Sequence, residues 1–151
     1  MIWLKRLIIN RKKQFPKGTA FLIVVLPYRY QISLVYEFFE IIFEDGIAGL
    51  VGVYFNISDN NSIIEAECAW IIAAHLQGRN LAARSAKKMI RFLSDAGVTT
   101  FVAHCDNRNI QSISVAKKLG FELLSDNGCR IYPKNKEQAT ESCFVLKIRG
   151  I

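Results

Sequence analysis

The chain has 151 residues, 51% of them hydrophobic and 22% charged, and a formal net charge of +7. These values exclude a disordered chain and fit one globular domain over residues 1–151. The positive charge favours an anionic ligand or surface, and it leaves nucleic acid, an acidic protein and a phosphorylated cofactor open.

Cysteine usage and apolar runs bear on the compartment. Cys68, Cys105, Cys129 and Cys143 include no C-x-x-C pair and have no histidine at metal-ligand spacing, which argues against zinc. The longest apolar run, Phe21–Leu26, is too short to cross a bilayer, and no cleavable signal is recognisable. We therefore predict free thiols, no bound metal, no membrane partner and a cytoplasmic location.

The first 37 residues form a short, atypical region that is rich in basic side chains and has no clear helical period. Leu4–Ile9 is compatible with a strand, and Phe21–Leu26 is predicted to be a buried strand that ends at Pro27. Gln31–Phe39 fits a helix face, but its aromatic and β-branched content also suits a strand.

The pattern becomes regular from residue 38 onward. Phe39–Glu44 is predicted to be a strand, Asp45-Gly46 a hairpin turn, and Leu50–Ile57 the return strand. A second turn at Ser58–Ser62 leads to a third strand, Ile63–Ala73. These three strands are expected to form an antiparallel meander.

A helix is predicted over Leu81–Ala96, with Gly97 as a left-handed cap. Residues at spacings of one, three or four cover one face, and basic residues cover the other. The first set is Leu81, Ala82, Ser85, Met89, Phe92 and Leu93, and the second is Arg84, Lys87, Lys88 and Arg91.

A second helix follows a strand rich in β-branched residues, Val98–Cys105. The helix spans Ile110–Leu119, with Asn109 as its N-cap and Gly120 as its stop. A strand then begins with Phe121–Leu124.

Residues 125–141 are predicted to be a polar loop before a last strand, Glu141–Ile148. From residue 38 the order is β-β-β-α-β-α-β-β. The helical crossover between Ala73 and Val98 makes its flanking strands parallel, with a right-handed connection. The fold class is therefore α+β, of the three-layer α/β/α kind, with a mixed and mostly antiparallel sheet.

Two short segments suggest chemistry. At Trp70–Arg84 a strand runs through a polar turn into a helix, and such a junction aims backbone N–H groups at one point, where they bind an anion. Gly78 and Ala82 allow close approach, and Arg79 adds charge. Read alone, this segment and Asn109–Ser112 also fit an ordinary turn and an ordinary helix cap.

Taken together and in this order, the segments resemble the GNAT superfamily of acetyl-CoA-dependent N-acetyltransferases, most closely the ribosomal-protein N-terminal acetyltransferases. The matching segments are Ala66–Ile71, then Gln77–Ala82, Asn109–Ser112 and Lys118–Phe121. The resemblance covers about residues 38–148.

The resemblance implies acetyl-CoA as cosubstrate, a parallel strand pair that splays at the cofactor site, and transfer to the amine of a small molecule or a protein N-terminus. It implies that a loop holds the pyrophosphate, that Asn109 and two strand residues contact the pantetheine arm, and that Ser112 lies near the thiolate. The loop residues are Gln77, Gly78, Arg79, Asn80, Leu81 and Ala82, and the strand residues are Ile71 and Ile72.

The candidate general base is Glu67, two residues from Glu65 and so on the same strand face. Its alternative is a solvated surface carboxylate. Ser112 and Tyr132 are candidates to donate the proton that the coenzyme thiolate needs. His75 is expected to be a loop residue and His104 a strand residue with one hydrogen bond; Cys68 and Cys105 are expected to be packed strand residues.

Two departures from the family pattern stand out. Asn80 occupies a position where the family usually has glycine, although asparagine tolerates positive φ. Residues 10–37 are short for the two helices that shape the acceptor pocket, so a partner subunit, as in a homodimer, could complete it. A non-catalytic module that binds coenzyme A or a protein is the alternative function, and nucleic-acid binding is disfavoured because no recognition motif accompanies the charge.

Overall fold

The computed structural model describes residues 21–24, 34–44, 46–57 and 63–148. The predictions for Leu4–Ile9, Asp45 and Ser58–Ser62 therefore lie outside the described residues. Seven strands, two α-helices and one 3₁₀ turn are described. They are β1 (Phe21–Val24), β2 (Leu34–Phe43), β3 (Gly46–Ile57), β4 (Ile63–Ile72), η1 (Ala74–Leu76), α1 (Leu81–Asp95), β5 (Thr100–Asp106), α2 (Ile110–Lys118), β6 (Glu122–Ile131) and β7 (Gln138–Lys147).

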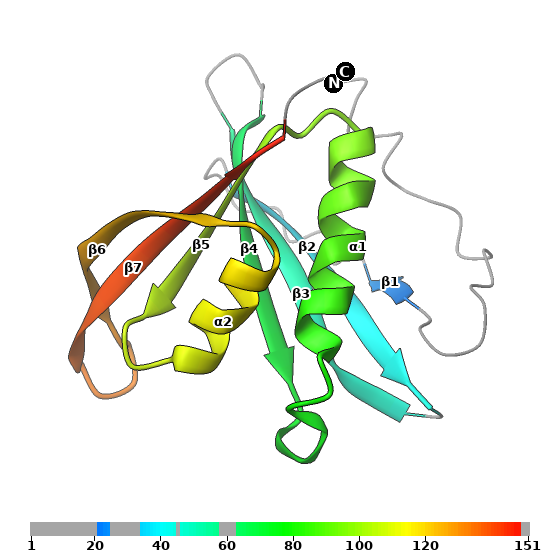
Figure 1. Cartoon of the computed structure of the whole chain (residues 1–151), viewed down its shortest axis with the longest axis horizontal. Coiled ribbons are helices and arrows are strands. Elements are labelled where there is room, and N and C mark those ends of the chain that lie inside the picture. Colours follow the sequence, from blue (N-terminus) through cyan, green and yellow to red (C-terminus); the bar gives the residue numbers. More distant parts are fainter. Residues whose placement is uncertain (1–20, 25–33, 45, 58–62, 149–151) are drawn as a thin grey trace.

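The described strands form one sheet in the order β1-β2-β3-β4-β5-β7-β6. Neighbouring strands are antiparallel except β4 and β5, which pair in parallel at Ala66 with Phe101 and at Glu67 with Val102. The predicted α+β fold with a mixed sheet and one parallel pair is confirmed. Figure 1 shows α1 and α2 on the same face of the sheet, and no helix of the described residues covers the other face.

The core lies between the sheet and α1. As predicted, one face of α1 is buried, and its half-buried Phe92 packs edge-on against Phe39 of β2, with ring centroids 6.5 Å apart. Full burial of one aliphatic side chain contributes roughly 1.5–3 kcal/mol. The helix ends at Asp95, and Gly97, two residues later, has a φ of 102°, which confirms the left-handed cap. The buried residues of α1 are Leu81, Ala82, Ala83, Ser85, Ala86, Met89, Ile90 and Leu93.

The prediction of a polar loop over residues 125–141 is wrong. β6 continues to Ile131, and β7 already begins at Gln138. β6 is an edge strand exposed along almost its whole length, and its pairing with β7 shifts register on either side of Ser125. An edge strand that buries neither face has no need of alternating apolar residues, so its sequence resembles a loop.

The segment Gln31–Phe39, which fitted a helix or a strand, is a strand from Leu34 onward. The predicted strand at Phe21–Leu26 is present as β1 and pairs with β2. Residues 25–33 are all that separates these two strands in the sequence. Among the described helices, none is long and apolar enough to cross a membrane.

Candidate functional site

The strands β4 and β5 separate after their two paired positions. Beyond Glu67, β4 keeps its partner β3 on one side, with Trp70 opposite Val51 and Ile72 opposite Gly49. Its other edge is on the β5 side of the sheet but has no paired residue there, and α2 lies over the diverging ends of the two strands (Figure 1). Backbone groups at the end of β4 are thus available to a ligand that enters between the strands.

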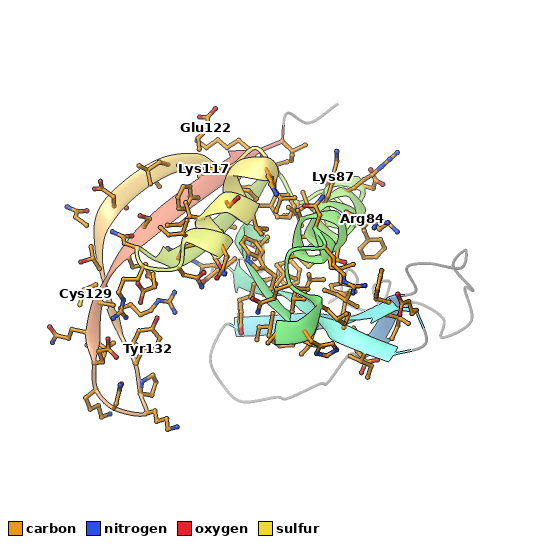
Figure 2. The ribbon with its side chains drawn as sticks, turned by 60° about the horizontal axis from the view of Figure 1, so that its bottom comes forward. Arg84, Lys87, Lys117, Glu122, Cys129 and Tyr132 are labelled. Carbon is orange, nitrogen blue, oxygen red and sulfur yellow. The ribbon has the colours of Figure 1, made fainter. Side chains whose placement is uncertain are left out.

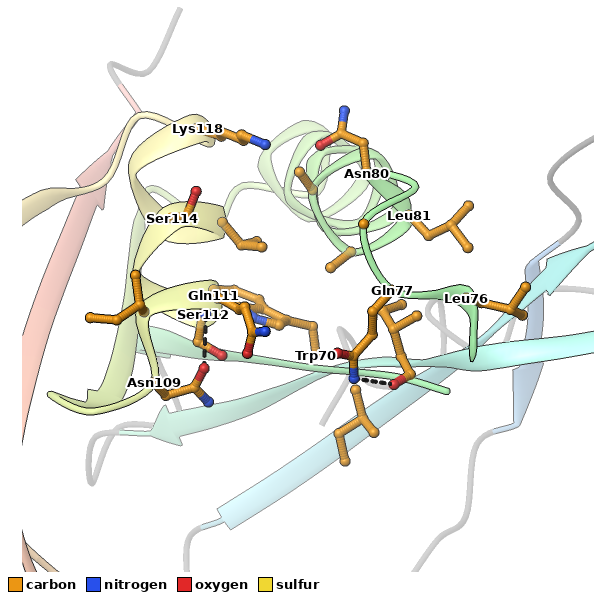
Figure 3. Close-up of a pocket in the computed structure, with 17 residues that line it drawn as sticks. Trp70, Leu76, Gln77, Asn80, Leu81, Asn109, Gln111, Ser112, Ser114 and Lys118 are labelled. Atoms are coloured by element: carbon orange, nitrogen blue, oxygen red, sulfur yellow. Dashed lines mark hydrogen bonds between the residues drawn. The ribbon is translucent and has the colours of Figure 1, made fainter. Parts of the chain in front are cut away.

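The first cavity, of about 650 Å³, lies between the end of β4, the loop that follows it, and the two helices. This volume is in the range of small-molecule and cofactor sites. Its lining joins residues 70–83 with residues 109–118, which the rest of α1 and the strand β5 separate in the sequence (Figure 3). The lining residues are Trp70, Ile71, Ile72, Leu76, Gln77, Gly78, Asn80, Leu81, Ala82, Ala83, Asn109, Ile110, Gln111, Ser112, Ser114, Val115 and Lys118.

The loop before α1 has left-handed backbone at Gly78, with φ 79°, and at Asn80, with φ 59° and ψ 19°. Asn80 therefore adopts the positive φ that asparagine is expected to tolerate. The Asn80 side chain makes no capping hydrogen bond, and the first turn of α1 carries no acidic residue. The N–H groups that open α1 are thus not capped by a side chain, at the positive end of the helix dipole, in the wall of the cavity.

Gln77 and Arg79 point in different directions. The Gln77 Nε2 donates a hydrogen bond to the backbone oxygen of Ile72 at 3.1 Å, which closes the turn (Figure 3). The Arg79 guanidinium lies 5.5 Å from the ring centroid of Phe43, and its Nη1 is 3.8 Å from Glu44 Oε1. Arg79 does not line the first cavity. The structure thus places this predicted cofactor residue toward the β2–β3 hairpin.

The N-terminus of α2 forms the opposite wall. Asn109 Oδ1 accepts a hydrogen bond from the backbone N–H of Ser112 at 3.0 Å, which confirms the predicted cap (Figure 3). Further along α2, the side chain of Lys118 points across the cavity toward α1. Sequence reasoning missed Gln111, Ser114 and Lys118 as lining residues, although their spacing of three and four places them on one helix face.

The second cavity, of about 400 Å³, lies between the diverging strands. It shares Trp70 and Ser112 with the first cavity, so the two adjoin there. The lining comes from β3, β4, β5, α2 and β6. The lining residues are Tyr54, Glu67, Cys68, Ala69, Trp70, Ala103, His104, Cys105, Ser112 and Arg130.

A hydrogen-bonded pair of ionisable side chains spans the second cavity. His104 Nδ1 of β5 lies 3.1 Å from Glu67 Oε1 of β4. The hydrogen bond to Glu67 raises the pKa of His104 above its usual value; partial burial opposes this, and Glu141 and Glu65 add to it. The hydrogen bond expected for His104 is present.

The thiols in the second cavity are inert. Cys68 and Cys105 are free and buried, as predicted. Burial raises the pKa of Cys68 to about 12 and that of Cys105 to about 11. Both therefore remain protonated near neutral pH, and neither is a nucleophile.

Tyr132 lies apart from both cavities. Its hydroxyl donates to Asp106 Oδ2 at 2.8 Å, and Arg108 donates to the same carboxylate and to Glu137. These bonds tie the β5–α2 loop to the β6–β7 hairpin; Figure 2 shows Tyr132 on that hairpin side. In the part of the chain that is described, no three His, Cys, Asp or Glu side chains could together hold a metal ion.

A family model described as acetyltransferase (GNAT) domain matches residues 11–122. Among curated proteins, no sequence matches. Solved structures do match. The microcin C7 self-immunity acetyltransferase MccE, in complex with acetyl-CoA and AMP, is 24% identical with a TM-score of 0.65 over 75% of this chain and 61% of its own.

Two further structures support the same fold. The ribosomal L7/L12 alpha-N-protein acetyltransferase RimL, in complex with coenzyme A, is 21% identical with a TM-score of 0.61 over 75% of this chain and 62% of its own. The putative acetyltransferase YncA of Salmonella typhimurium, with acetyl-CoA, is 16% identical with a TM-score of 0.66 over 77% of this chain and 66% of its own. The chain thus spans less than two thirds of the length of these proteins.

Proposed function

The chain belongs to the GNAT acetyltransferase family, and we propose that it transfers the acetyl group of acetyl-CoA to a primary amine by direct attack in a ternary complex. The observation that carries this proposal is the pair of cavities that adjoin at Trp70 and Ser112. One cavity has the features of a phosphate-bearing cofactor site, and the other has ionisable groups. Two reactants held there would meet at the junction.

The first cavity fits the diphosphate of coenzyme A. The N–H groups at the start of α1, which Asn80 does not cap, can bind its oxygens, and Lys118 can pair with a phosphate from the opposite wall. Gln77, Gly78, Asn80, Leu81 and Ala82 line this part of the cavity, in agreement with the roles that the sequence suggests for them.

The strand end fits the pantetheine arm. Ile71 and Ile72 lie beyond the last parallel pair of β4, where the strand edge no longer pairs with β5; the Ile72 oxygen, which accepts from Gln77 Nε2, has a second lone pair for an amide N–H of the arm. The Asn109 Oδ1 is used by its cap, so its side-chain NH₂ is the group left to donate to the arm. This placement directs the thioester toward Trp70 and Ser112.

The protein's own groups then have three tasks. They hold amine and thioester together, accept a proton from the ammonium, and return a proton to the departing thiolate. Ser112, which lines both cavities, is placed to donate a proton to the thiolate. The second cavity, which Glu67 lines, supplies the group that takes the proton from the ammonium. Tyr132 is not included because its hydroxyl donates to Asp106.

The structural neighbours suggest two classes of acceptor amine. One neighbour is described as an alpha-N-protein acetyltransferase and another as a self-immunity acetyltransferase. We therefore include both a protein N-terminus and small-molecule amines among the candidates. The ionic groups of the second cavity suit a cationic amine.

Amine-dependent release of thiol from acetyl-CoA tests the proposal. Purified protein is assayed against peptides with free N-termini, polyamines, amino acids and amino sugars, with calorimetry of acetyl-CoA binding in parallel. We expect saturable acetyl-CoA binding, a KM for acetyl-CoA between about 1 μM and 1 mM, turnover with at least one amine, and slower turnover in Ser112→Ala at unchanged affinity. Binding without turnover would support a non-catalytic module that binds coenzyme A, and absence of binding would reject both this module and the enzyme, leaving only a protein-binding module.

A further inference from the structure

The ionisable groups of the second cavity form a pair that the strand register creates. Glu67 of β4 is the last residue paired with β5, opposite Val102, and His104 lies two residues further along β5 on the same face as Val102. The side chains meet where the strands begin to separate. Both line the cavity that adjoins the cofactor site.

The pair has a defined orientation. Nδ1 of His104 lies 3.1 Å from Glu67 Oε1, so in the neutral ring Nδ1 carries the hydrogen and Nε2 holds the free lone pair. Within the described part of the chain, Nε2 has no hydrogen-bond partner. The two side chains remain 32% and 42% exposed, respectively, so a ligand in the cavity can reach them.

The backbone of His104 is held by a side chain of β6. The Arg130 Nη2 donates to the backbone oxygen of His104 at 3.3 Å, and the Arg130 guanidinium forms an ion pair with Glu141 of β7. Arg130 thus supports the strand position of His104 without using a ring nitrogen. The ring is fixed by Glu67 and its backbone by Arg130.

We propose that His104 is the group that takes the proton from the acceptor's ammonium, and that Glu67 positions the imidazole and stabilises its charged form. This inference rests on the proposed function and names the proton acceptor for it. It assigns to Glu67, the base that the sequence suggests, the role of a positioning residue.

The step balances as follows. Nε2 of His104 accepts a proton from R–NH₃⁺, and the lone pair so released attacks the thioester carbonyl carbon. The C–S bond breaks, its electron pair leaves on sulfur, and the second nitrogen proton passes to the thiolate by way of Ser112. The products are the N-acetyl amine, coenzyme A thiol and an imidazolium that returns its proton to water.

The charges around His104 determine its pH range. Glu65 and Glu67 face it from β4, Glu141 and Cys143 from β7, and Arg130 from β6. Because the hydrogen bond to Glu67 raises the pKa of His104 above its usual value, the free base forms as pH rises through that raised pKa and is lost as pH falls below it. Catalytic rate should rise with pH through this range.

The test compares three variants by pH–rate profile and by NMR titration of the His104 ring in the full chain. His104→Gln should lower kcat/KM about 100-fold with unchanged acetyl-CoA affinity and should lose the acid limb. Glu67→Gln keeps a hydrogen-bond acceptor for Nδ1 without its charge, so the limb and the NMR titration should both move to lower pH. Glu65→Gln removes a smaller charge contribution from the same strand face, so it should move the limb to lower pH by less than Glu67→Gln does.

The outcomes separate the inference from the proposed function. If wild type turns over an amine and His104→Gln keeps its rate and its acid limb while Glu67→Gln loses activity, Glu67 is the base and the inference is overturned, with the function intact. A limb that does not move in Glu67→Gln also overturns it. Lack of turnover in wild type at every pH would reject the function and the inference together.

Discussion

At the scale of single residues, the backbone angles of the loop before α1 decide how the first cavity is shaped. Gly78 and Asn80 both have positive φ, which costs residues other than glycine about 1–2 kcal/mol. Nothing lies within 4 Å of a Cβ placed on Gly78, so the backbone conformation and not the space favours glycine there.

Gly78→Ala should therefore destabilise the protein by about 1–2 kcal/mol and weaken acetyl-CoA binding, because the loop relaxes toward negative φ. Asn80→Gly relieves the same kind of strain and should leave both stability and affinity equal or improved. Denaturant unfolding and calorimetry measure the two effects. Undiminished acetyl-CoA affinity in Gly78→Ala would contradict the role of this loop.

Two adjacent lysines give a sharper test of the phosphate site. Lys118 lines the first cavity and points toward α1 (Figure 3), whereas Lys117 projects from α2 and does not line it (Figure 2). Lys118→Ala should weaken coenzyme A binding roughly tenfold, since a charge-assisted hydrogen bond contributes about 1.5 kcal/mol. Lys117→Ala is the control and should bind as wild type does. Equal losses would indicate general attraction by the basic surface.

At the scale of elements, the close approach of β3 and β4 supports the strand end that lines the cavity. A Cβ on Gly49 would lie 2.0 Å from the backbone oxygen of Ile71. Gly49→Ala should push the strands apart and cost about 1–3 kcal/mol. Gly46→Ala, on the same strand with nothing within 4 Å of its Cβ, is the matched control. Thermal unfolding compares them, and similar midpoints would contradict the packing.

The β5–α2 loop depends on carboxylates. Hydrogen bonds from Arg108 and Tyr132 hold the pKa of Asp106 far below its usual value, and Arg108 also lowers the pKa of Glu137. A depressed carboxylate pKa stabilises the fold above the ordinary value of about 4, and this stabilisation is lost as pH falls through the lower, folded value.

We therefore expect the free energy of unfolding to decrease below about pH 4, and to depend less on pH in Arg108→Gln. Urea unfolding at a series of acidic pH values measures this. Arg91→Gln, an exposed change on α1, provides the comparison. If the free energy of unfolding of Arg108→Gln depended on acidic pH as that of the wild type does, the hydrogen bonds of Arg108 to Asp106 and Glu137 would contribute nothing to stability.

At the scale of the whole molecule, the sequence predicts those elements that bury a face. The spacing of apolar residues identifies α1, and β4, the helix cap at Asn109 and the crossover follow from local chemistry. β6 is missed because an exposed edge strand with shifted register lacks alternation.

The parts of the site that are formed by the backbone could be predicted from the sequence, and the parts that are formed by side chains could be predicted less well. Gly78 and Asn80 are recognisable because their backbone conformation restricts residue type. The direction of the Arg79 side chain could not be predicted, because a long side chain can turn either way from a loop. The contact between Glu67 and His104 depends on the register of β4 with β5, which no local pattern specifies.

Basic residues cover the outer side of α1, where Figure 2 shows Arg84 and Lys87. They match the predicted charged face and explain part of the net charge of +7 without a nucleic-acid motif.

The central claim is that the two adjoining cavities hold the cofactor and the amine. A crystal structure with coenzyme A tests it most directly: we predict the diphosphate at the first turn of α1 and the sulfur beside Trp70 and Ser112. Coenzyme bound elsewhere, or with its sulfur away from the second cavity, would contradict the account.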